Sequence, residues 1–287
     1  MTDLLGARTD MEAVTLHVDD LTVMSAYYRD AVGLVSLAQG NGSEVLGRGT
    51  RQVIVLNHTP GLPRPGRNEA GLFHTAILFD DQASLAAAVL STARHPRSQF
   101  VGSADHLVSE AFYFTDPEGN GIELYVDRDR AQWQYHGDQI LMDTRHLNAE
   151  TYLRNHLTEQ ASAGLRDAAA KVGHVHLQVG DIPMARKFYA DALGFAVTFD
   201  APGALFVSAG GYHHHLAVNV WNSRGAGPRA STLGLGEVTI TVPERAELDA
   251  AADRMRHRGI TVHDDGRSLA MDDPWRNRVT LALDAAA

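Results

Sequence analysis

An internal repeat constrains the fold of this 287-residue chain more than any other feature of its sequence. The segment LHVDDLTVMSAYYRDAVGL, residues 16–34, aligns with LQVGDIPMARKFYADALGF, residues 177–195, at a constant offset of 161 positions. Two aspartates, a tyrosine and a glycine recur at this offset: Asp20/Asp181, Tyr28/Tyr189, Asp30/Asp191 and Gly33/Gly194. A repeat of this kind indicates that the fold contains the same supersecondary unit at least twice.

Each copy of the repeat is expected to form a strand followed by a helix. Apolar residues alternate before the first aspartate, as in a strand, and then recur at helical spacing. The helices should end at Gly33 and Gly194, because glycine readily adopts the left-handed conformation that terminates many helices. Tyr28 and Tyr189 lie at helical core spacing, so we expect them to pack in the core and not to stack on a substrate.

A second, weaker pair of segments, residues 71–93 and 235–259, again predicts a strand and then a helix. An Asp-Pro turn and a final strand close each of these segments, in TDPEGNGIELYV and DDPWRNRVTLAL. The chain is therefore expected to contain four βαβββ modules, at about residues 11–60, 70–128, 172–222 and 233–284.

We predict an α+β fold in which the four modules form two barrel-like, curved mixed sheets. The first pair of modules should occupy residues 1–128, and the second pair residues 172–287. Residues 129–171 should link the pairs, and the Ala-rich, polar part of this linker predicts a connecting helix.

Composition excludes several classes of function. The chain has no cysteine, so disulfides, zinc–thiolate sites, iron–sulfur clusters and a thiol nucleophile are excluded, and any metal must bind to nitrogen and oxygen. The net charge of −10, with no cluster of lysine and arginine, argues against binding to nucleic acid. The N-terminal residues MTDLLGARTDMEA lack a basic region followed by an apolar core, and no apolar run approaches the ~20 residues that a bilayer requires. We therefore expect a cytoplasmic protein that acts on a small molecule without membrane contact, and homo-oligomerisation is left open.

Two histidines and one glutamate stand out as candidate metal ligands. A site without cysteine favours the two-histidine, one-carboxylate set of non-heme iron centres, which leaves open positions. His74 and His174 lie in the opening strands of the second and third modules. Glu123 lies between two apolar residues of a closing strand, where a carboxylate is costly to bury unless it is paired or ligated. A lone strand histidine is more often half exposed or packed, but the three together favour ligation.

Four segments resemble a known superfamily, and the resemblance covers nearly the whole chain: GLFHTAIL, SEAFYFTDPEGNGIELYVDR, VGHVHLQVGDI and ALFVSAGGYHHHLAVNVW. They are similar to vicinal oxygen chelate proteins (glyoxalases, bleomycin-resistance proteins and extradiol dioxygenases), and most of all to the catechol 2,3-dioxygenase-like group. In this group the opening strands of two paired modules and the closing strand of one provide the metal ligands. The resemblance places His74, Glu123 and His174 at these positions and implies Fe(II), with Mn(II) or another divalent metal as an alternative.

The first and fourth modules carry different residues at the equivalent positions. Ala13 stands where the third module has its histidine, and Glu237 and Thr280 stand where the second module has its histidine and glutamate. Because these three form a poor iron set, we expect one metal, held by the second and third modules, and a vestigial counterpart in the first and fourth. This pairing crosses the repeat halves and differs from the family arrangement, in which the third and fourth modules hold the metal.

The resemblance also implies roles for residues around the metal. Tyr113, ten residues before the candidate glutamate ligand, matches a tyrosine that hydrogen-bonds a substrate oxygen. His214 matches a pocket histidine that acts as acid and base and stabilises an oxygen intermediate. His106 resembles a second pocket histidine, although its spacing differs by two residues. His176 lies two residues beyond the second histidine ligand, on the same strand face, where it either lines the pocket or packs in the core.

The other histidines are assigned no catalytic role. His213 and His215 flank His214 in a predicted strand, so their side chains should point to the opposite face and be surface or structural residues. His17 aligns with Gln178 in the repeat, which indicates a solvated position.

The implied function is an extradiol ring-cleaving dioxygenase whose partners are a small aromatic vicinal diol and O2. The diol would chelate the metal through two oxygens, and the ring would be cleaved beside them. Two other classes share the fold. A glyoxalase-like metal-dependent isomerase or thiol transferase favours four protein ligands, whereas three are found here. A bleomycin-resistance-type binding protein needs no metal, and the fold alone does not separate these classes.

Overall fold

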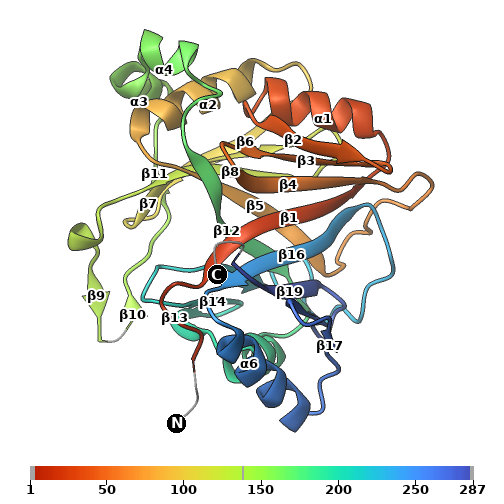
Figure 1. Cartoon of the computed structure of the whole chain (residues 1–287). Helices are drawn as coiled ribbons and strands as arrows, with labels where there is room; N and C mark the ends of the chain where they lie inside the picture. The colour runs from red at the N-terminus through yellow and green to blue at the C-terminus, as the bar shows by residue number, and fades with distance from the viewer. Residues whose placement is uncertain (1–3, 138, 285–287) are drawn as a thin grey trace. The chain divides into compact units, whose positions relative to one another are not determined.

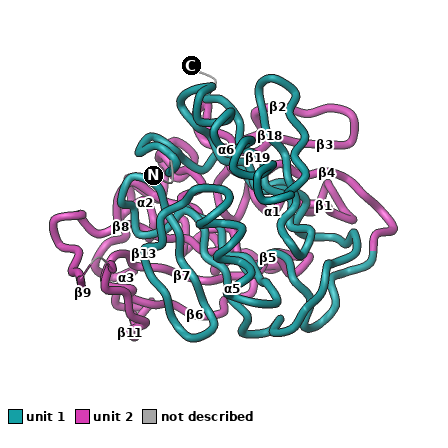
Figure 2. Tube along the Cα trace, turned by 90° about the horizontal axis from the view of Figure 1, so that it is seen from below, with its two compact units in different colours: residues 1–15, 63–73, 174–287 teal, residues 16–62, 74–173 magenta. Residues whose placement is uncertain are grey.

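The computed structural model describes residues 4–137 and 139–284 (Figure 1). The chain divides into two compact units (Figure 2). Unit 1 comprises residues 1–15, 63–73 and 174–287, and unit 2 comprises residues 16–62 and 74–173. The strands in the described residues form two large mixed sheets, of eight and nine strands, and a separate two-stranded ribbon. The predicted α+β class with two mixed sheets is confirmed, whereas the proposed domain boundaries at residues 128 and 172 stay a prediction.

Three strands cross the boundaries between the units: β1 (Asp10–Val18), β5 (Gly71–Phe79) and β12 (Ala170–Gln178). Unit 2 also contains the strands β2 (Val35–Gly40), β3 (Ser43–Arg48), β4 (Arg51–His58), β6 (Gln99–Asp105), β7 (Ser109–Thr115), β8 (Gly121–Asp127), β9 (Tyr135–His136), β10 (Gln139–Ile140) and β11 (Arg145–His146). Its helices are α1 (Leu21–Asp30), α2 (Gln82–Arg94), the 3-10 helix η1 (Arg130–Gln132), α3 (Ala149–His156) and α4 (Glu159–Ala163).

Unit 1 contains the strands β13 (Ala196–Ala201), β14 (Ala204–Ser208), β15 (Leu216–Asn219), β16 (Gly234–Val242), β17 (His263–Asp264), β18 (Ser268–Asp272) and β19 (Arg278–Leu283). Its helices are α5 (Ile182–Arg186), the π-helix η2 (Lys187–Ala192) and α6 (Arg245–His257).

The second, third and fourth modules share one strand pattern. In each of them the opening strand pairs in parallel with the closing strand, as β5 with β8, β12 with β15 and β16 with β19. The closing strand continues into an antiparallel meander, for example β8–β7–β6 in unit 2 and β15–β14–β13 in unit 1. The opening and closing strands of a module are therefore neighbours in the sheet, and side chains on the same face of both strands lie close together. The candidate ligands lie on such neighbouring strands.

The repeated helices begin as predicted but end before the predicted glycines, because α1 ends at Asp30, three residues before Gly33, and η2 ends at Ala192, two residues before Gly194. The carboxylates of Asp20 and Asp181 cap α1 and α5 by accepting hydrogen bonds from backbone N–H groups in the first turn. Gly33 and Gly194 follow the helices with φ of 81° and 101°, where other residues would be strained. The second copy differs in one respect, because α5 continues into the π-helix η2 instead of remaining α-helical.

Each repeated tyrosine is buried and bonded to an aspartate in an Asp-Pro turn. The Tyr28 hydroxyl donates to Asp116 Oδ2 at 3.0 Å, and the Tyr189 hydroxyl donates to Asp273 Oδ2 at 2.8 Å. Burial raises the pKa of Asp116 to about 6 and also raises the pKa of Asp273. These pairs join the first module to the second and the third module to the fourth. Sequence analysis identified the tyrosines as core residues but missed their partners.

The predicted linker, residues 129–171, contains η1, two short strands that form the ribbon, β11, and the helices α3 and α4. Its helical part is broken because Leu157 ends α3 and Thr158 caps α4 through its side-chain oxygen. Among the helices of the described residues, none has the length and apolar character needed to cross a membrane.

Candidate metal centre

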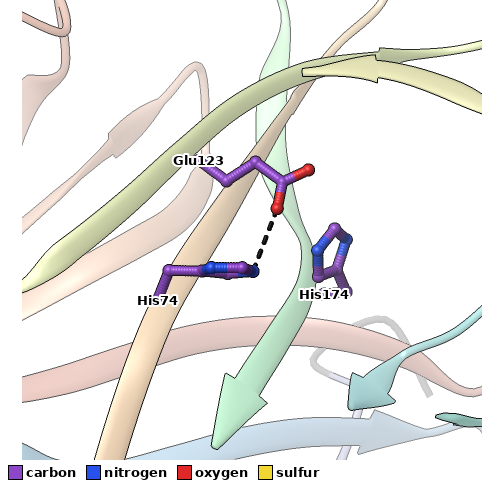
Figure 3. Close-up of side chains that lie close together, drawn as sticks. All are labelled: His74, Glu123 and His174. Atoms are coloured by element: carbon purple, nitrogen blue, oxygen red, sulfur yellow. Dashed lines mark ion pairs between the residues drawn. The ribbon is translucent and has the colours of Figure 1, made fainter. Parts of the chain in front are cut away.

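The three candidate ligands lie together on strands β5, β8 and β12 (Figure 3). His74, Glu123 and His174 each offer one ligand atom, and these atoms all lie within 4.8 Å of one another. The side chains are nearly inaccessible, with 6%, 2% and 2% of their residue surface exposed. His74 Nε2 lies 2.9 Å from Glu123 Oε2.

Strand register explains why these side chains meet. In the parallel pair β5–β8, Glu123 lies opposite Ala76, and His74 is two residues before Ala76. Side chains two residues apart share one face of a strand, so His74 and Glu123 point to the same side.

Gly173 allows β12 to pass close to the same face. A Cβ atom at this position would lie only 1.8 Å from the Tyr125 hydroxyl oxygen, so no larger residue fits without movement. Tyr125 lies two residues after Glu123 in β8. This close approach fixes the backbone position from which the next residue, His174, projects.

The donor set fits a divalent metal ion. Two imidazoles and one carboxylate match the nitrogen and oxygen ligands of non-heme iron sites and occupy only part of an octahedral shell. A buried carboxylate beside two imidazoles is costly unless a positive charge balances it. A metal site of this kind needs three or more histidine or acidic side chains with their ligand atoms close together. Among the described residues, His74, Glu123 and His174 form such a group.

Tyr113 lies beside the candidate ligand on the neighbouring strand β7, where it is the register partner of Glu123. Burial raises the pKa of Tyr113 well above its usual value, and the charge of Glu123 raises it further, so the phenol stays protonated. The Tyr113 hydroxyl lies 2.7 Å from His106 Nε2. His106 Nδ1 lies 2.8 Å from the carbonyl oxygen of Asp143, which can only accept. His106 Nδ1 must therefore carry the proton, and in the neutral ring Nε2 accepts from Tyr113.

His214 lies against the candidate ligand His174, with the ring centroids 4.0 Å apart. Its Nδ1 is 2.7 Å from Nδ1 of His213, so one of the two nitrogens donates and the other accepts. The edge of the Phe206 ring packs against His214 at a centroid distance of 5.0 Å.

The predicted strand HHHLAVNVW is wrong at its start, because β15 begins only at Leu216. Gly210 and Gly211 have φ of 61° and 68° and turn the chain just before the three histidines, so the side chains do not alternate between two faces. His213 and His215 are buried, with 0% and 6% exposure, so the expectation that they could be surface residues is wrong. His215 Nδ1 lies 2.9 Å from Ser208 Oγ, which indicates a structural role.

His176 is buried on the same strand as His174, and its Nε2 lies 2.9 Å from Nδ2 of Asn219. Asn219 Oδ1 accepts from the backbone N–H of Trp221, so the amide nitrogen is the donor to His176. The rings of Phe73 and Trp221 lie 5.0 and 5.3 Å from the imidazole. His176 is therefore held by a hydrogen bond within an aromatic cluster.

Sequence analysis missed three residues of this environment: His213, Asn219 and Asp143. Asp143 acts through its backbone carbonyl, which leaves no signal in residue type. His213 was set aside because the strand prediction turned it away from His214. Asn219 sits near the end of an apolar strand, and an amide there could have been read as a partner for a nearby buried histidine.

Comparisons with known proteins show which family the chain is similar to. The sequence model of the Glyoxalase/Bleomycin resistance protein/Dioxygenase superfamily matches residues 171–281. Catechol-2,3-dioxygenase of Bacillus subtilis (strain 168) is 36% identical over 254 residues, which is 86% of this chain and 88% of the relative. Biphenyl-2,3-diol 1,2-dioxygenase 3 of Rhodococcus globerulus is 28% identical over 120 residues, which is 40% of this chain and 63% of that protein.

Solved structures show the same fold. A crystal structure of a proposed dioxygenase from Bacillus subtilis subsp. subtilis strain 168 has a TM-score of 0.66 at 12% identity, covering 99% of this chain and 87% of the other. Glyoxalase I from Zea mays has a TM-score of 0.59 at 18% identity, covering 96% and 92%. Together with the extended similarity to the Bacillus catechol-2,3-dioxygenase, these findings show that the chain belongs to the glyoxalase/bleomycin resistance protein/dioxygenase superfamily and, within it, to a dioxygenase family.

Proposed function

We propose that this chain is an extradiol dioxygenase that cleaves a small catechol-like vicinal diol with O2, using Fe(II) held by His74, Glu123 and His174. The observation that carries the proposal is the buried set of two imidazoles and one carboxylate, with all ligand atoms within 4.8 Å of one another. The similarity over 86% of the chain to a relative named catechol-2,3-dioxygenase supports the same reaction class.

A bound Fe(II) would supply a Lewis acid that acidifies a chelating diol and a path for electrons from the aromatic ring to O2. Three protein ligands leave enough coordination positions for both reactants. A binding protein of the bleomycin-resistance kind would have no need of this buried donor set.

Tyr113 is proposed to position the substrate. Its hydroxyl is protonated, belongs to the strand next to Glu123, and lies 2.7 Å from His106 Nε2. A phenol carries one proton, so this hydroxyl must release His106 Nε2 before it can donate to a substrate oxygen bound near the carboxylate. Until then His106 would hold the phenol in place, and the carbonyl of Asp143 would orient the imidazole.

His214 is proposed to move the proton during ring cleavage. Its ring packs against His174, so a substrate near the metal lies within reach of this imidazole. Nδ1 of His214 is engaged with Nδ1 of His213. Proton transfer to or from substrate would therefore use Nε2, while His213 exchanges the proton on the opposite side of the ring.

His176 is proposed to form part of the wall around an aromatic substrate and not to transfer a proton. Its Nε2 accepts from Asn219, and the rings of Phe73, Phe206 and Trp221 surround it. Such a wall suits a planar, apolar ring.

Metal analysis of anaerobically purified protein, followed by oxygen uptake with a panel of catechols, tests the proposal. We expect one iron per chain and consumption of one O2 per diol cleaved. Turnover of a non-phenolic substrate under strict anaerobiosis would instead favour a glyoxalase-like isomerase. Tight binding of a planar ligand by protein that consumes no O2 with any vicinal diol would favour the binding-protein class.

A further inference from the structure

Unit 1 contains a cavity of about 580 Å³ that shares no lining residue with the metal centre. Its walls come from α5 and η2, from the segment that follows α6, and from β18 with the turn after it. The volume falls within the range of about 300–1,000 Å³ that is usual for small-molecule sites.

The repeat shows how this cavity arises. In unit 2 the equivalent positions hold packed aromatic side chains: Tyr27 lies 5.1 Å from the ring of His95, its hydroxyl lies 3.1 Å from Ser98 Oγ, and Phe114 is 1% exposed. In unit 1 these positions are replaced by residues that line the cavity, and the pairs are Tyr27/Phe188, His95/Arg258, Ser98/Thr261 and Phe114/Met271.

Each pairing follows from a matched landmark. Phe188 stands at the repeat offset of 161 from Tyr27. Arg258 and His95 are the C-cap residues of α6 and α2, two helices of 13 residues each. Met271 stands two residues before the aspartate of its Asp-Pro turn, as Phe114 does in the other unit. The cavity lining therefore differs in residue type from the matching positions of unit 2.

The cavity is positively charged although the chain carries a net charge of −10. Lys187 and Arg258 line it, both are exposed, and neither forms an ion pair with any carboxylate of the described residues. The third strong cation, Arg278, is already matched by Asp272, with Nε and Oδ1 2.7 Å apart.

Two other titratable side chains, Asp273 and His263, also line the cavity. Asp273 accepts hydrogen bonds from the Tyr189 hydroxyl and the Asn277 amide and, among the described residues, forms no ion pair with Lys187. His263 adds a further positive charge only when it is protonated. An anion entering the cavity thus meets two unmatched cations.

The floor of the cavity is apolar. Phe188 and Met271 are 3% and 2% exposed, and Met184, Ile260 and Pro274 extend this lining. A charged rim above an apolar floor fits a ligand that has both a charged group and an apolar body.

We propose that this cavity binds a small organic carboxylate, with Lys187 and Arg258 binding the carboxylate group and Phe188 and Met271 contacting the apolar body. The proposal rests on the cavity alone and holds whether or not the metal centre cleaves diols. Charge-assisted hydrogen bonds to the two cations fix the polar end, and burial of apolar surface selects against small hydrophilic anions.

Isothermal titration of the full chain tests the site with three probes: benzoate, its neutral isostere benzamide, and acetate, which lacks the apolar body. We expect saturable binding of benzoate, and at least roughly tenfold weaker binding of benzamide and acetate. The His174→Ala variant should bind benzoate as the wild type does, because this change alters the metal centre and not the cavity. Loss of benzoate binding in His174→Ala would assign the ligand to the metal centre and overturn the proposal.

Two kinds of variant locate the site. The double variant Lys187→Gln/Arg258→Gln should weaken benzoate binding at least roughly tenfold. The control Arg256→Gln/Arg267→Gln removes the same charge from exposed residues that do not line the cavity, and it should leave binding unchanged. Met271→Phe, which introduces the side chain of the matching position in unit 2, should block the cavity. Equal benzoate affinity in the wild type and the lysine–arginine double variant would contradict the proposal, whether or not Met271→Phe folds.

Discussion

The parallel strand pairs β5–β8 and β16–β19 are built alike but carry different side chains. In β5–β8, Glu123 lies in the strand opposite Ala76, two residues beyond His74. In β16–β19, Thr280 lies opposite Thr239, two residues beyond Glu237. The alignment of these positions in the sequence analysis is confirmed by register.

The difference between the two pairs lies in side-chain chemistry and not in backbone geometry. A histidine and a glutamate on one scaffold provide a nitrogen and an oxygen ligand, whereas a glutamate and a threonine on the other do not form the two-histidine set that a non-heme iron centre requires. The fold supplies matching positions, and the residues at those positions decide where a metal can bind. The following predictions test this comparison, beginning with the largest effect.

Removing a ligand from one pair should abolish activity, and the matched change in the other pair should not. Glu123→Ala should lower O2 uptake with catechol by at least roughly 100-fold, since loss of residues that merely support metal ligands already costs 10- to 100-fold. Thr280→Ala, at the equivalent position of β19, should retain wild-type uptake. Equal loss in both variants would show that the two pairs do not differ in function.

Changing the residues beside the ligands should reduce turnover and preserve metal content. His214→Ala should lower kcat by roughly 10²- to 10⁴-fold if this imidazole transfers the proton. Tyr113→Phe should also lower turnover, because the donor to the substrate oxygen is removed. The control Tyr135→Phe changes a tyrosine that is 58% exposed and should have no effect. A His214→Ala protein with full activity would remove this residue from the mechanism.

A pH-dependent stability should arise from a feature that both units retain, the buried Tyr–Asp pair. Because the pKa of Asp116 is about 6 when folded, against 3.8 for a solvent-exposed aspartate in the unfolded chain, the folded chain binds the extra proton between these pH values. The contribution of protonated Asp116 to the free energy of unfolding is therefore complete below pH 3.8 and is lost as the pH rises through 6. At 1.36 kcal/mol per pKa unit, the difference approaches about 3 kcal/mol.

Urea unfolding at a series of pH values measures this effect. The free energy of unfolding of wild type, relative to that of Asp116→Asn, should fall between pH 4 and pH 6. Asp273→Asn should reveal a change of the same direction in unit 1, since burial raises the pKa of Asp273 as well. A relative stability that rises over this range would contradict the assignment for that aspartate.

The smallest expected effect concerns the hydroxyl groups of the same pairs. Tyr28→Phe and Tyr189→Phe each remove one buried hydrogen bond to a carboxyl group and should each cost about 1–3 kcal/mol of unfolding free energy. Metal content should not change in either variant. A loss confined to one variant would show that the two pairs do not contribute alike.

The sequence predicted the modules because their signals are local. Alternating apolar residues, capping aspartates and the glycines after the repeated helices determine strand, helix start and helix end with little influence from distant residues. The candidate ligands were proposed from residue type and from the resemblance to extradiol dioxygenases, and the repeat provided a matched control position for each of them.

Features that depend on tight turns and on side-chain packing were not predicted. The three histidines at 213–215 have a strand-like sequence, but the turn at Gly210 and Gly211 and the packing of Tyr212 on His213 and His215 determine their conformation. The π-helix η2 and the pairing of each tyrosine with an Asp-Pro turn also depend on packing. The recurrence of a tyrosine and of an Asp-Pro turn in both halves could have suggested the latter.

The measurement that tests the central claim most directly is the metal content of three proteins purified anaerobically in parallel: wild type, His74→Ala and Glu237→Ala. Glu237→Ala alters the position in β16 that matches His74 in β5. We predict one metal per chain in the wild type and in Glu237→Ala, and loss of the metal from a folded His74→Ala protein. Full metal content in His74→Ala, or loss of metal in Glu237→Ala alone, would contradict the assignment of the site to His74, Glu123 and His174.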